Sequence, residues 1–259
     1  MGSINNVERL RSRLEEGKVC MGTSVQVTDP LVSELAAEAG SDFIWIEMEH
    51  SHMDLRAALG HIMAVRGTHA APLVRVQSPD ENIIKPYLDM CPAGIIIPML
   101  TSARQTEQIV KACRYPPHGT RGFGPIRNMY GLDSIEEYLK IAEEQILIIA
   151  HIETIDAVRD LDAILQVPGL DGICLGRNDL SGSMNKLGQH SDPEVVAAID
   201  TIIEKTVNSG LWMGCSIGAN PQQAIEWRKK GMHWFSVGDD VGHIFDGAKA
   251  IADTLHALD

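Results

Sequence analysis

Short apolar segments alternate with amphipathic segments along the whole chain. Eight apolar segments have the length of a β-strand, and they lie at 19–27, 42–48, 71–76, 94–100, 146–152, 172–175, 211–217 and 234–237. Several are apolar at almost every position, which is typical of parallel strands covered on both faces. The pattern therefore predicts a buried parallel sheet.

A candidate helix follows each of these eight strands. The amphipathic segments lie at 29–39, 55–65, 81–90, 103–113, 155–165, 193–208, 221–230 and 244–258. Asp29 is expected to cap the first helix, with Pro30 at its first position. Four helices are expected to stop at a glycine just after them, at Gly40, Gly67, Gly210 and Gly231.

Eight strand–helix repeats in a chain of 259 residues predict an α/β fold, a single (β/α)8 TIM-barrel domain over residues 1–259. The alternative is an open doubly wound sheet, whose first turn usually carries the glycine pattern G-x-G-x-x-G. Here that turn reads Val27-Thr28-Asp29-Pro30, so the barrel is favoured. Residues 115–132 form a loop rich in Gly, Pro and Arg, and loops longer than about 12 residues tend to be functional.

The composition narrows the class of protein. The chain carries 22 Lys and Arg against 35 Asp and Glu, a net charge of −13, which argues against nucleic-acid or anionic-membrane partners. No apolar run approaches the roughly 18 residues of a membrane span. The five cysteines are scattered and form no C-x-x-C pair, so we expect reduced thiols in a cytoplasmic protein.

Polar residues gather where the predicted strands end. They are Glu47, Glu49 and His50 after the second strand, Arg75 on the third, His151 and Glu153 on the fifth, Asn178 and Asp179 on the sixth, and Asp239 and Asp240 on the eighth. The carboxyl ends of barrel strands meet at one mouth, where barrel enzymes place their reacting groups. The sequence therefore predicts one site built from several strands.

Glu153 and Asp179 are the candidate metal ligands. They follow neighbouring strands, so both are expected to reach one ion near the barrel axis. Two carboxylates completed by water suit a hard cation such as Mg²⁺ or Mn²⁺. The alternative for either residue alone is a helix cap or a pair with a surface lysine.

His50 and Arg75 are the candidate catalytic side chains. A histidine exchanges protons near neutral pH, so His50 is the natural general base; the alternatives are a purely structural hydrogen bond or a weak metal pair with His52. Arg75 can hold a carboxylate or stabilise an oxyanion, or simply form a salt bridge across the mouth. No serine or cysteine nucleophile motif and no P-loop is present. No interior position of a predicted strand holds a lysine, which disfavours Schiff-base aldolase chemistry.

Several motifs together resemble the HpcH/HpaI family of metal-dependent class II pyruvate aldolases, from about Val19 to near the C-terminus. The motifs that carry the resemblance are I-E-M-E-H (46–50), L-V-R (73–75), Y-L-D (87–89), R-Y-P-P-H-G-T-R-G (114–122), H-I-E-T (151–154), D-G-I-C-L-G-R-N-D-L-S (171–181) and V-G-D-D (237–240). Each is weak alone; their combination in this order is specific.

The resemblance implies a carbon–carbon lyase that reversibly cleaves a 4-hydroxy-2-oxo acid to pyruvate and an aldehyde through a metal-stabilised pyruvate enolate. Glu153 and Asp179 would ligate the divalent metal, and Arg75 would stabilise the enolate oxygen. His50 would act as base through water, oriented by Asp89, which in such oligomers can come from a neighbouring subunit. Family members are typically hexamers that exchange the last helix between paired subunits, which implies a homo-hexamer.

Other residues would support this site. Backbone amides around Asn178 and Asp179 would help hold the pyruvate carboxylate, while Glu47, Glu49 and His151 would stand behind the reacting groups. Many relatives carry Gln at the position of His151 and Asp at that of Glu47. His151 could join the metal ligands, which would favour Zn²⁺, Co²⁺ or Mn²⁺, or hydrogen-bond to a ligand, the reading we prefer.

One further departure concerns the mouth of the barrel. Relatives often carry Pro where this chain has Arg177, and the extra charge is a candidate for binding an acidic acceptor. Competing functions are an oxaloacetate-type decarboxylase or malyl-CoA-type lyase on the same enolate, a sugar-phosphate barrel enzyme, and a non-catalytic ligand-binding barrel. Two acidic residues, Asp239 and Asp240, would repel a phosphate, so the sugar-phosphate enzyme ranks low among these alternatives.

Overall fold

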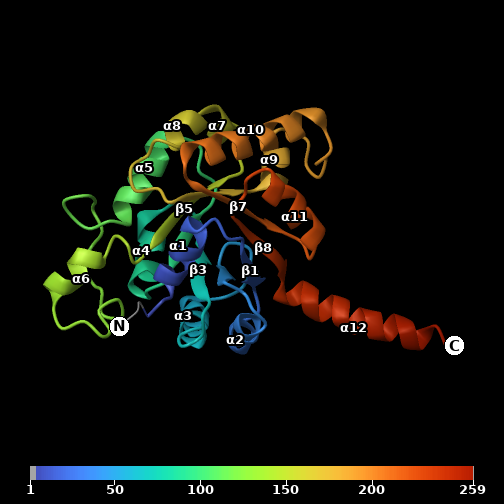
Figure 1. Ribbon diagram of the computed structural model, residues 1–259, viewed down its shortest axis with the longest axis horizontal. Coiled ribbons are helices and arrows are strands. Elements are labelled where there is room, and N and C mark those ends of the chain that lie inside the picture. Colours follow the sequence, from blue (N-terminus) through green and yellow to red (C-terminus); the bar gives the residue numbers. More distant parts are fainter. Residues whose placement is uncertain (1–3, 259) are drawn as a thin grey trace.

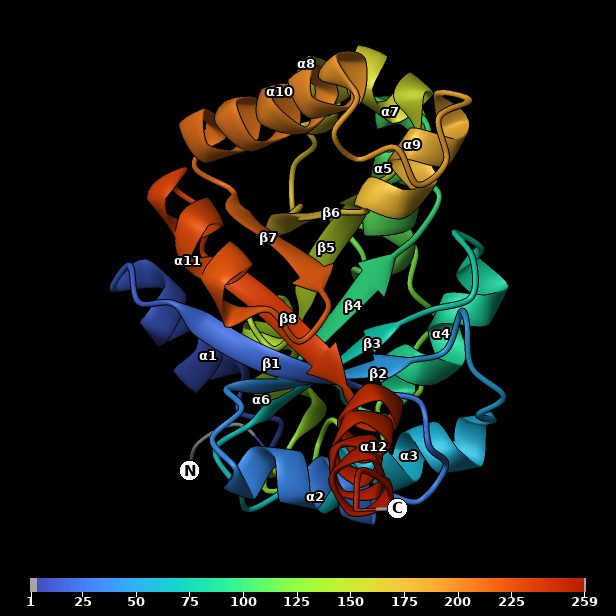
Figure 2. The same cartoon turned by 90° about the vertical axis from the view of Figure 1, so that its right-hand side faces the viewer.

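Eight parallel strands close into a barrel in the computed structural model, which describes residues 4–258; the outermost positions of the predicted domain lie outside that range. Each strand pairs with its neighbours in chain order and β8 pairs back onto β1 (Figure 2). The strands are β1 (Cys20–Val25), β2 (Phe43–Glu47), β3 (Ala71–Arg75), β4 (Gly94–Ile97), β5 (Leu147–Ile152), β6 (Gly172–Leu175), β7 (Trp212–Ile217) and β8 (Trp234–Asp239). The predicted TIM barrel is confirmed.

Helices surround the barrel and close one of its ends. They are α1 (Val7–Glu15), α2 (Leu31–Glu38), α3 (Leu55–Ala64), α4 (Glu81–Asp89), α5 (Ala103–Ala112), α6 (Ile135–Ile141), α7 (Ile155–Arg159), α8 (Leu161–Ile164), α9 (Arg177–Ser183), α10 (Pro193–Ser209), α11 (Pro221–Lys229) and α12 (Asp240–His256). None of the helices in residues 4–258 is long and apolar enough to cross a membrane.

Successive side chains of each strand point to opposite faces of the barrel wall, and this alternation separates two apolar cores. Ile44 and Ile46 point outward and pack under the surrounding helices in the larger core. Phe43 and Trp45 point inward, into a smaller core within the barrel that α1 closes with Leu10 and Leu14. Glu47 continues the inward series and stands opposite Arg75 in the β2–β3 register, so this pair forms the top layer of the barrel interior.

Several helix boundaries differ from the prediction. The predicted helix at 155–165 is two short helices, α7 and α8, and the last helix begins at Asp240 rather than at 244. Pro30, not Asp29, is the residue that precedes α2, and the Asp29 carboxylate accepts a hydrogen bond from the Leu31 amide beside it. The pattern did not indicate α6 or α9, which have seven residues each, or α1, whose three apolar residues stand among charged and polar ones.

Helix α12 runs outward from the barrel (Figure 1). Among its described side chains only Asp240 is buried, and apolar side chains as large as Ile244, Phe245 and Ile251 are more than 60% exposed, at 62%, 64% and 66%. An amphipathic helix normally buries its apolar face against another element. Residues 4–258 of this chain do not cover that face.

All five cysteines are buried free thiols. Burial raises the pKa of Cys20 and Cys91 to about 11 and that of Cys113 to about 12, so their reactive thiolate forms are scarce. We expect the native protein to resist dithionitrobenzoate at mildly alkaline pH and to release colour from five thiols only in denaturant. Rapid reaction of even one thiol in the native protein would contradict this burial.

Candidate active site

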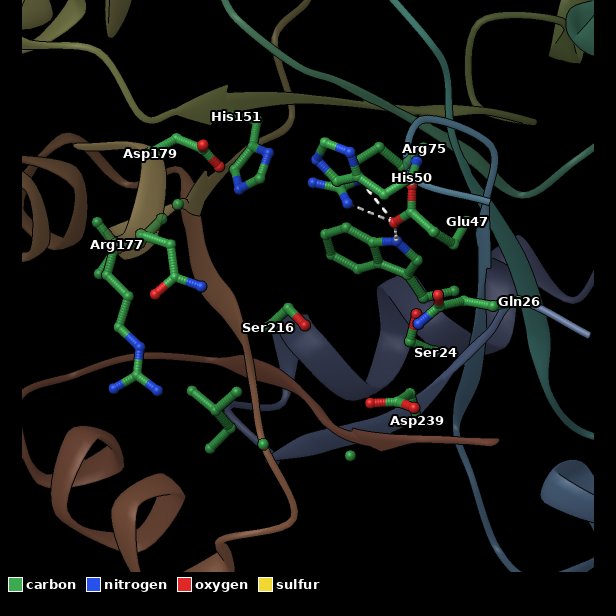
Figure 3. Close-up of a pocket in the computed structure, with 17 residues that line it drawn as sticks. Ser24, Gln26, Glu47, His50, Arg75, His151, Arg177, Asp179, Ser216 and Asp239 are labelled. Carbon is green, nitrogen blue, oxygen red and sulfur yellow. Dashed lines mark hydrogen bonds and ion pairs between the residues drawn. The ribbon is translucent and has the colours of Figure 1, made fainter. Parts of the chain in front are cut away.

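A cavity of about 530 Å³ opens at the carboxyl ends of the strands. Its wall includes His50, Arg75, His151, Asn178 and Asp179, all of which the sequence singled out (Figure 3). Ligand sites of barrel enzymes lie at this end of the fold, and pockets of about 300–1,000 Å³ are typical of small-molecule sites. The structure therefore brings most of the predicted site residues to one cavity.

Glu47 organises one side of this cavity. Its Oε2 accepts hydrogen bonds from Trp45 Nε1 at 2.9 Å and Arg75 Nε at 2.7 Å, while Arg75 Nη2 also lies 2.6 Å away. Its Oε1 accepts from the backbone amides of Glu49 and His50, at 2.8 and 3.0 Å. One buried carboxylate thus fixes both the arginine and the backbone of the loop that carries the histidine.

Arg75 is held as a cation. Burial acts to lower its pKa, but the carboxylates of Glu47 and Glu49 more than offset that effect, and the net shift is upward. Its guanidinium also lies 5.4 Å from the ring centre of Trp45, and its Nη1 lies 3.1 Å from Glu49 Oε2. All three nitrogens have carboxylate partners, yet Nη1 and Nη2 each carry a second N–H that can face the cavity.

His50 is more exposed than the Glu47, Glu49 and Arg75 side chains beside it. Its side chain is 61% exposed, and its Nε2 lies 3.7 Å from Glu49 Oε2. The imidazole is drawn beside Arg75 in the cavity wall (Figure 3). Its neighbour His52 is also exposed but does not line the cavity, so the structure does not bring the two histidines into one metal pair.

Glu153 lies behind the cavity wall, next to His151, which lines the cavity. Glu153 follows β5, its Oε1 accepts a hydrogen bond from the Met99 amide at 2.7 Å, and its Oε2 lies 3.2 Å from His151 Nδ1. Burial raises the pKa of Glu153 to about 7, with Glu49 and Asp179 adding to the rise. Burial, then the charge of Arg75, lowers the pKa of His151 well below its usual value, so this close contact involves a neutral imidazole.

Gly176 allows these two side chains to approach the next strand. A Cβ at this position would lie 2.6 Å from Glu153 Oε2 and 2.7 Å from His151 Nε2. Only glycine leaves room for both polar atoms at the end of β6. Asp179 follows three residues later and is close enough to raise the pKa of Glu153 through repulsion between the carboxylates.

The donor chemistry at this point fits a hard divalent cation. Glu153 and Asp179 are carboxylates that follow the successive strands β5 and β6, and a cation between them would offset their mutual repulsion. No group of three or more His, Cys, Asp or Glu residues within 4–258 forms a ready-made metal cluster. Water or substrate oxygens would therefore complete the coordination, as is usual for Mg²⁺.

The structure places three of the predicted residues more exactly than the sequence did. Asn178 and Asp179 are in the first turn of α9, after Gly176, rather than at the end of the sixth strand. Asp89 does not line the cavity of this chain: it ends α4, and its Oδ1 accepts a hydrogen bond from Arg121 Nη2 at 2.9 Å.

The two acidic residues after β8 have different surroundings. The Asp239 carboxylate caps α12 by accepting from the Gly242 amide at 2.7 Å, and Asp239 lines the cavity. Asp240 is buried and accepts hydrogen bonds from the amides of Gln26 and Val27. Asp240 therefore ties α12 to the loop after β1, while Asp239 leaves one face toward the cavity.

Trp45 and Gly176 are site residues that the sequence reasoning missed. Trp45 precedes Glu47 by two positions, so the period of two in β2 was the signal that both point inward. For Gly176 the signal was its position between β6 and two predicted site residues, Asn178 and Asp179. Neither signal identifies the atom that each residue contacts.

Comparison with known proteins places these residues in a family. The model of the HpcH/HpaI aldolase/citrate lyase family matches residues 22–247. The chain belongs to the HpcH/HpaI aldolase/citrate lyase family. It is 34% identical over 247 residues to the hydroxypyruvate/pyruvate aldolase of Pseudomonas aeruginosa, a match that covers 95% of this chain and 92% of that protein.

A second relative and a solved structure show a comparable similarity to this chain. The 4-hydroxy-2-oxovalerate aldolase of Rhodococcus jostii is 35% identical over 208 residues, with 79% of each chain covered. The crystal structure of the citrate synthase SbnG superposes with a TM-score of 0.87 at 31% identity and covers 96% of this chain and 98% of that one. The predicted family resemblance is confirmed, and the aldolase names favour a lyase over a non-catalytic barrel.

Proposed function

We propose that this protein is a divalent-metal-dependent aldolase that reversibly cleaves a 4-hydroxy-2-oxo acid to pyruvate and an aldehyde. The observation that carries the proposal is the convergence of His50, Arg75 and Asp179 on one cavity, with Glu153 directly behind it, in a member of an aldolase family. Within residues 4–258, no comparable feature favours the decarboxylase or the CoA-thioester lyase.

Glu153 and Asp179 would hold the metal. Mg²⁺ or Mn²⁺ suits two carboxylates and water best, while Co²⁺ or Zn²⁺ would suit a site in which His151 also binds. When bound, the metal supplies Lewis-acid stabilisation to the keto and carboxylate oxygens of pyruvate. The neutral state of His151 is compatible with either role, as ligand or as hydrogen-bonding neighbour.

Arg75 would stabilise the enolate. Removal of a methyl proton from pyruvate places negative charge on the former keto oxygen, and a preorganised cation at that point lowers the barrier. The contacts to Glu47 and Glu49 hold the guanidinium still, so little reorganisation is needed when the charge appears. The backbone amides at Asn178 and Asp179, in the first turn of α9, have no helical partners and would hold the carboxylate.

His50 would move the proton. In the synthetic direction a water relays a proton from pyruvate C3 to the imidazole, C3 then bonds to the aldehyde carbon, and the new alkoxide takes the proton back. Cleavage runs through the same steps in reverse. Because Asp89 lies outside the cavity of its own chain, it would orient His50 only if it came from a neighbouring subunit.

That requirement supports a homo-oligomer, and we propose a homo-hexamer. The uncovered apolar face of α12, which includes Ile244 and Phe245, is what a helix exchanged between paired subunits would present. The single barrel of residues 1–259 would then hold the whole site apart from Asp89. The buried free thiols support a reducing, cytoplasmic location.

Removal of the metal by a chelator should abolish the aldolase activity. After treatment with a chelator, we expect pyruvate release from a 4-hydroxy-2-oxo acid to fall to background in a lactate-dehydrogenase-coupled assay. Adding Mg²⁺ or Mn²⁺ should restore it, because the metal offsets the charge on the enolate. The coupling enzyme is first shown to tolerate the chelator. Full activity in the chelated protein, with no bound metal detected by mass spectrometry, would contradict the metal requirement.

A further inference from the structure

The backbone of Met99 is strained at the point where it contacts a candidate metal ligand. Met99 follows β4, and its φ of 53° lies in the left-handed region, which glycine and asparagine adopt more readily than other residues do. Within 4–258, three other non-glycine residues have a positive φ, and two of them are the asparagines Asn6 and Asn185. A methionine in this conformation indicates that its surroundings hold it there.

The side chain of Met99 does not explain this conformation. Met99 is 46% exposed, belongs to neither apolar core and does not line the cavity. Its backbone amide, by contrast, donates a hydrogen bond to Glu153 Oε1 at 2.7 Å. The conformation therefore serves the amide and not the side chain.

The chain is anchored on both sides of Met99. Before it, Ile97 ends β4 in the larger core, and the ring of Pro98 fixes its φ. After it, the Leu100 side chain is buried in the same core, and the Leu100 carbonyl accepts a hydrogen bond from Thr154 Oγ1 at 3.1 Å. A change of φ at Met99 would therefore turn the peptide that carries its N–H, because the chain beyond it is held.

Glu153 depends on this donor for its position. Glu153 is 1% exposed, and its Oε2 lies 3.2 Å from His151 Nδ1, while the Met99 amide donates to Oε1. Asp179 is close enough for the two carboxylates to repel each other when no cation lies between them. The Met99 amide therefore holds Oε1 against that repulsion.

We propose that the left-handed conformation of Met99 fixes Glu153 before the metal binds, which makes Met99 a positioning residue for the divalent cation. This inference rests on the metal-dependent function proposed above. A carboxylate that is already in place loses little conformational freedom when it binds a cation, and groups that orient a metal ligand contribute about 10- to 100-fold to metal affinity. Any residue that adopts a positive φ at this position would then serve.

Replacements at position 99 separate the backbone from the side chain. Met99→Val introduces a β-branched side chain, which is strongly disfavoured at a φ of 53°, whereas Met99→Gly and Met99→Asn permit that angle. Electron paramagnetic resonance of the free ion measures Mn²⁺ binding to the chelator-treated protein without any turnover. We expect Kd to rise about 10- to 100-fold in Met99→Val and to stay within about threefold of wild type in the other two variants.

Met63→Val is the matched control. It makes the same change at a methionine of α3 that is 57% exposed, and it should leave Kd unchanged. Turnover of Met99→Val should fall at low Mn²⁺ and recover at saturating Mn²⁺, a pattern that loss of folded protein does not produce. Wild-type affinity in Met99→Val would overturn the inference, and so would equally weak binding in Met99→Gly and Met99→Asn.

The wild-type protein provides a test that depends on no variant. Hydrogen exchange of peptides that span Met99 is followed by mass spectrometry in the chelated protein, with and without Mg²⁺. We expect the Met99 amide to be protected in both states, because its contact with Glu153 precedes metal binding. Rapid exchange in the chelated protein that becomes slow only with Mg²⁺ would contradict the proposal, even if Met99→Val does not fold.

Metal binding by the wild-type protein separates this inference from the proposed function. If the wild type binds Mn²⁺ and exchanges the methyl protons of pyruvate, but Met99→Val binds the ion equally tightly, only the positioning role is wrong. If the wild type binds no divalent metal, the metal-dependent aldolase and the role of Met99 are both overturned.

Discussion

Replacing Glu153 with Gln is expected to lower turnover by about a thousandfold or more, because a divalent metal supplies several kcal/mol of transition-state stabilisation and the amide binds it poorly. The fold should survive. The amide oxygen can still accept the Met99 N–H, and the variant no longer buries an ionisable group at a position only 1% exposed. Steady-state kinetics at saturating Mn²⁺ measures the first effect and thermal unfolding of the chelated protein the second.

Two further variants complete that experiment. Asp179→Asn should lose activity in the same way. Glu107→Gln makes the same chemical change at an exposed residue of α5, paired only with Lys111, and should behave as wild type. Wild-type turnover in either Glu153→Gln or Asp179→Asn would remove that residue from the metal site.

His50→Ala should slow proton removal from pyruvate by about two to four orders of magnitude, the usual contribution of a general base. The imidazole is exposed to the cavity and does not pack in either core of the barrel, so the free energy of unfolding should be unchanged. Solvent-exchange rates of the pyruvate methyl group, followed by NMR in D₂O, measure the effect.

His52→Ala is the matched control for that variant. It removes the same side chain two residues away, at an exposed position that does not line the cavity, and should leave the exchange rate close to wild type. A change of less than about threefold in His50→Ala, far below the usual range for a general base, would exclude His50 from proton transfer.

The fold could be predicted because each strand satisfies a strong and simple requirement. A barrel strand covered on both faces must be apolar nearly throughout, and segments such as 146–152 are. Helices such as α9 could not be predicted, because they are short and carry no complete apolar stripe. Local capping and contacts with neighbouring elements determine where such helices begin and end.

The candidate site could be predicted only in part. The rule that reacting groups follow barrel strands identified Arg75, Glu153 and the residues near them, because that rule depends on topology alone. It could not reveal that one carboxylate, Glu47, holds both Arg75 and the His50 loop, since those contacts depend on distances between strands. The same rule could not show that Asp89 lies outside the cavity of its own chain. There Asp89 pairs with Arg121.

The central claim is that this cavity forms the enolate of pyruvate with the help of a metal, and one measurement tests it without knowledge of the aldehyde. The chelated protein is incubated with pyruvate in D₂O, Mg²⁺, Mn²⁺, Co²⁺ or Zn²⁺ is added in turn, and the methyl proton signal is followed by NMR. We expect the signal to be lost with at least one metal, faster than with that metal alone, and the loss to stop when chelator is added. A signal that persists at the protein-free rate with every metal would contradict it.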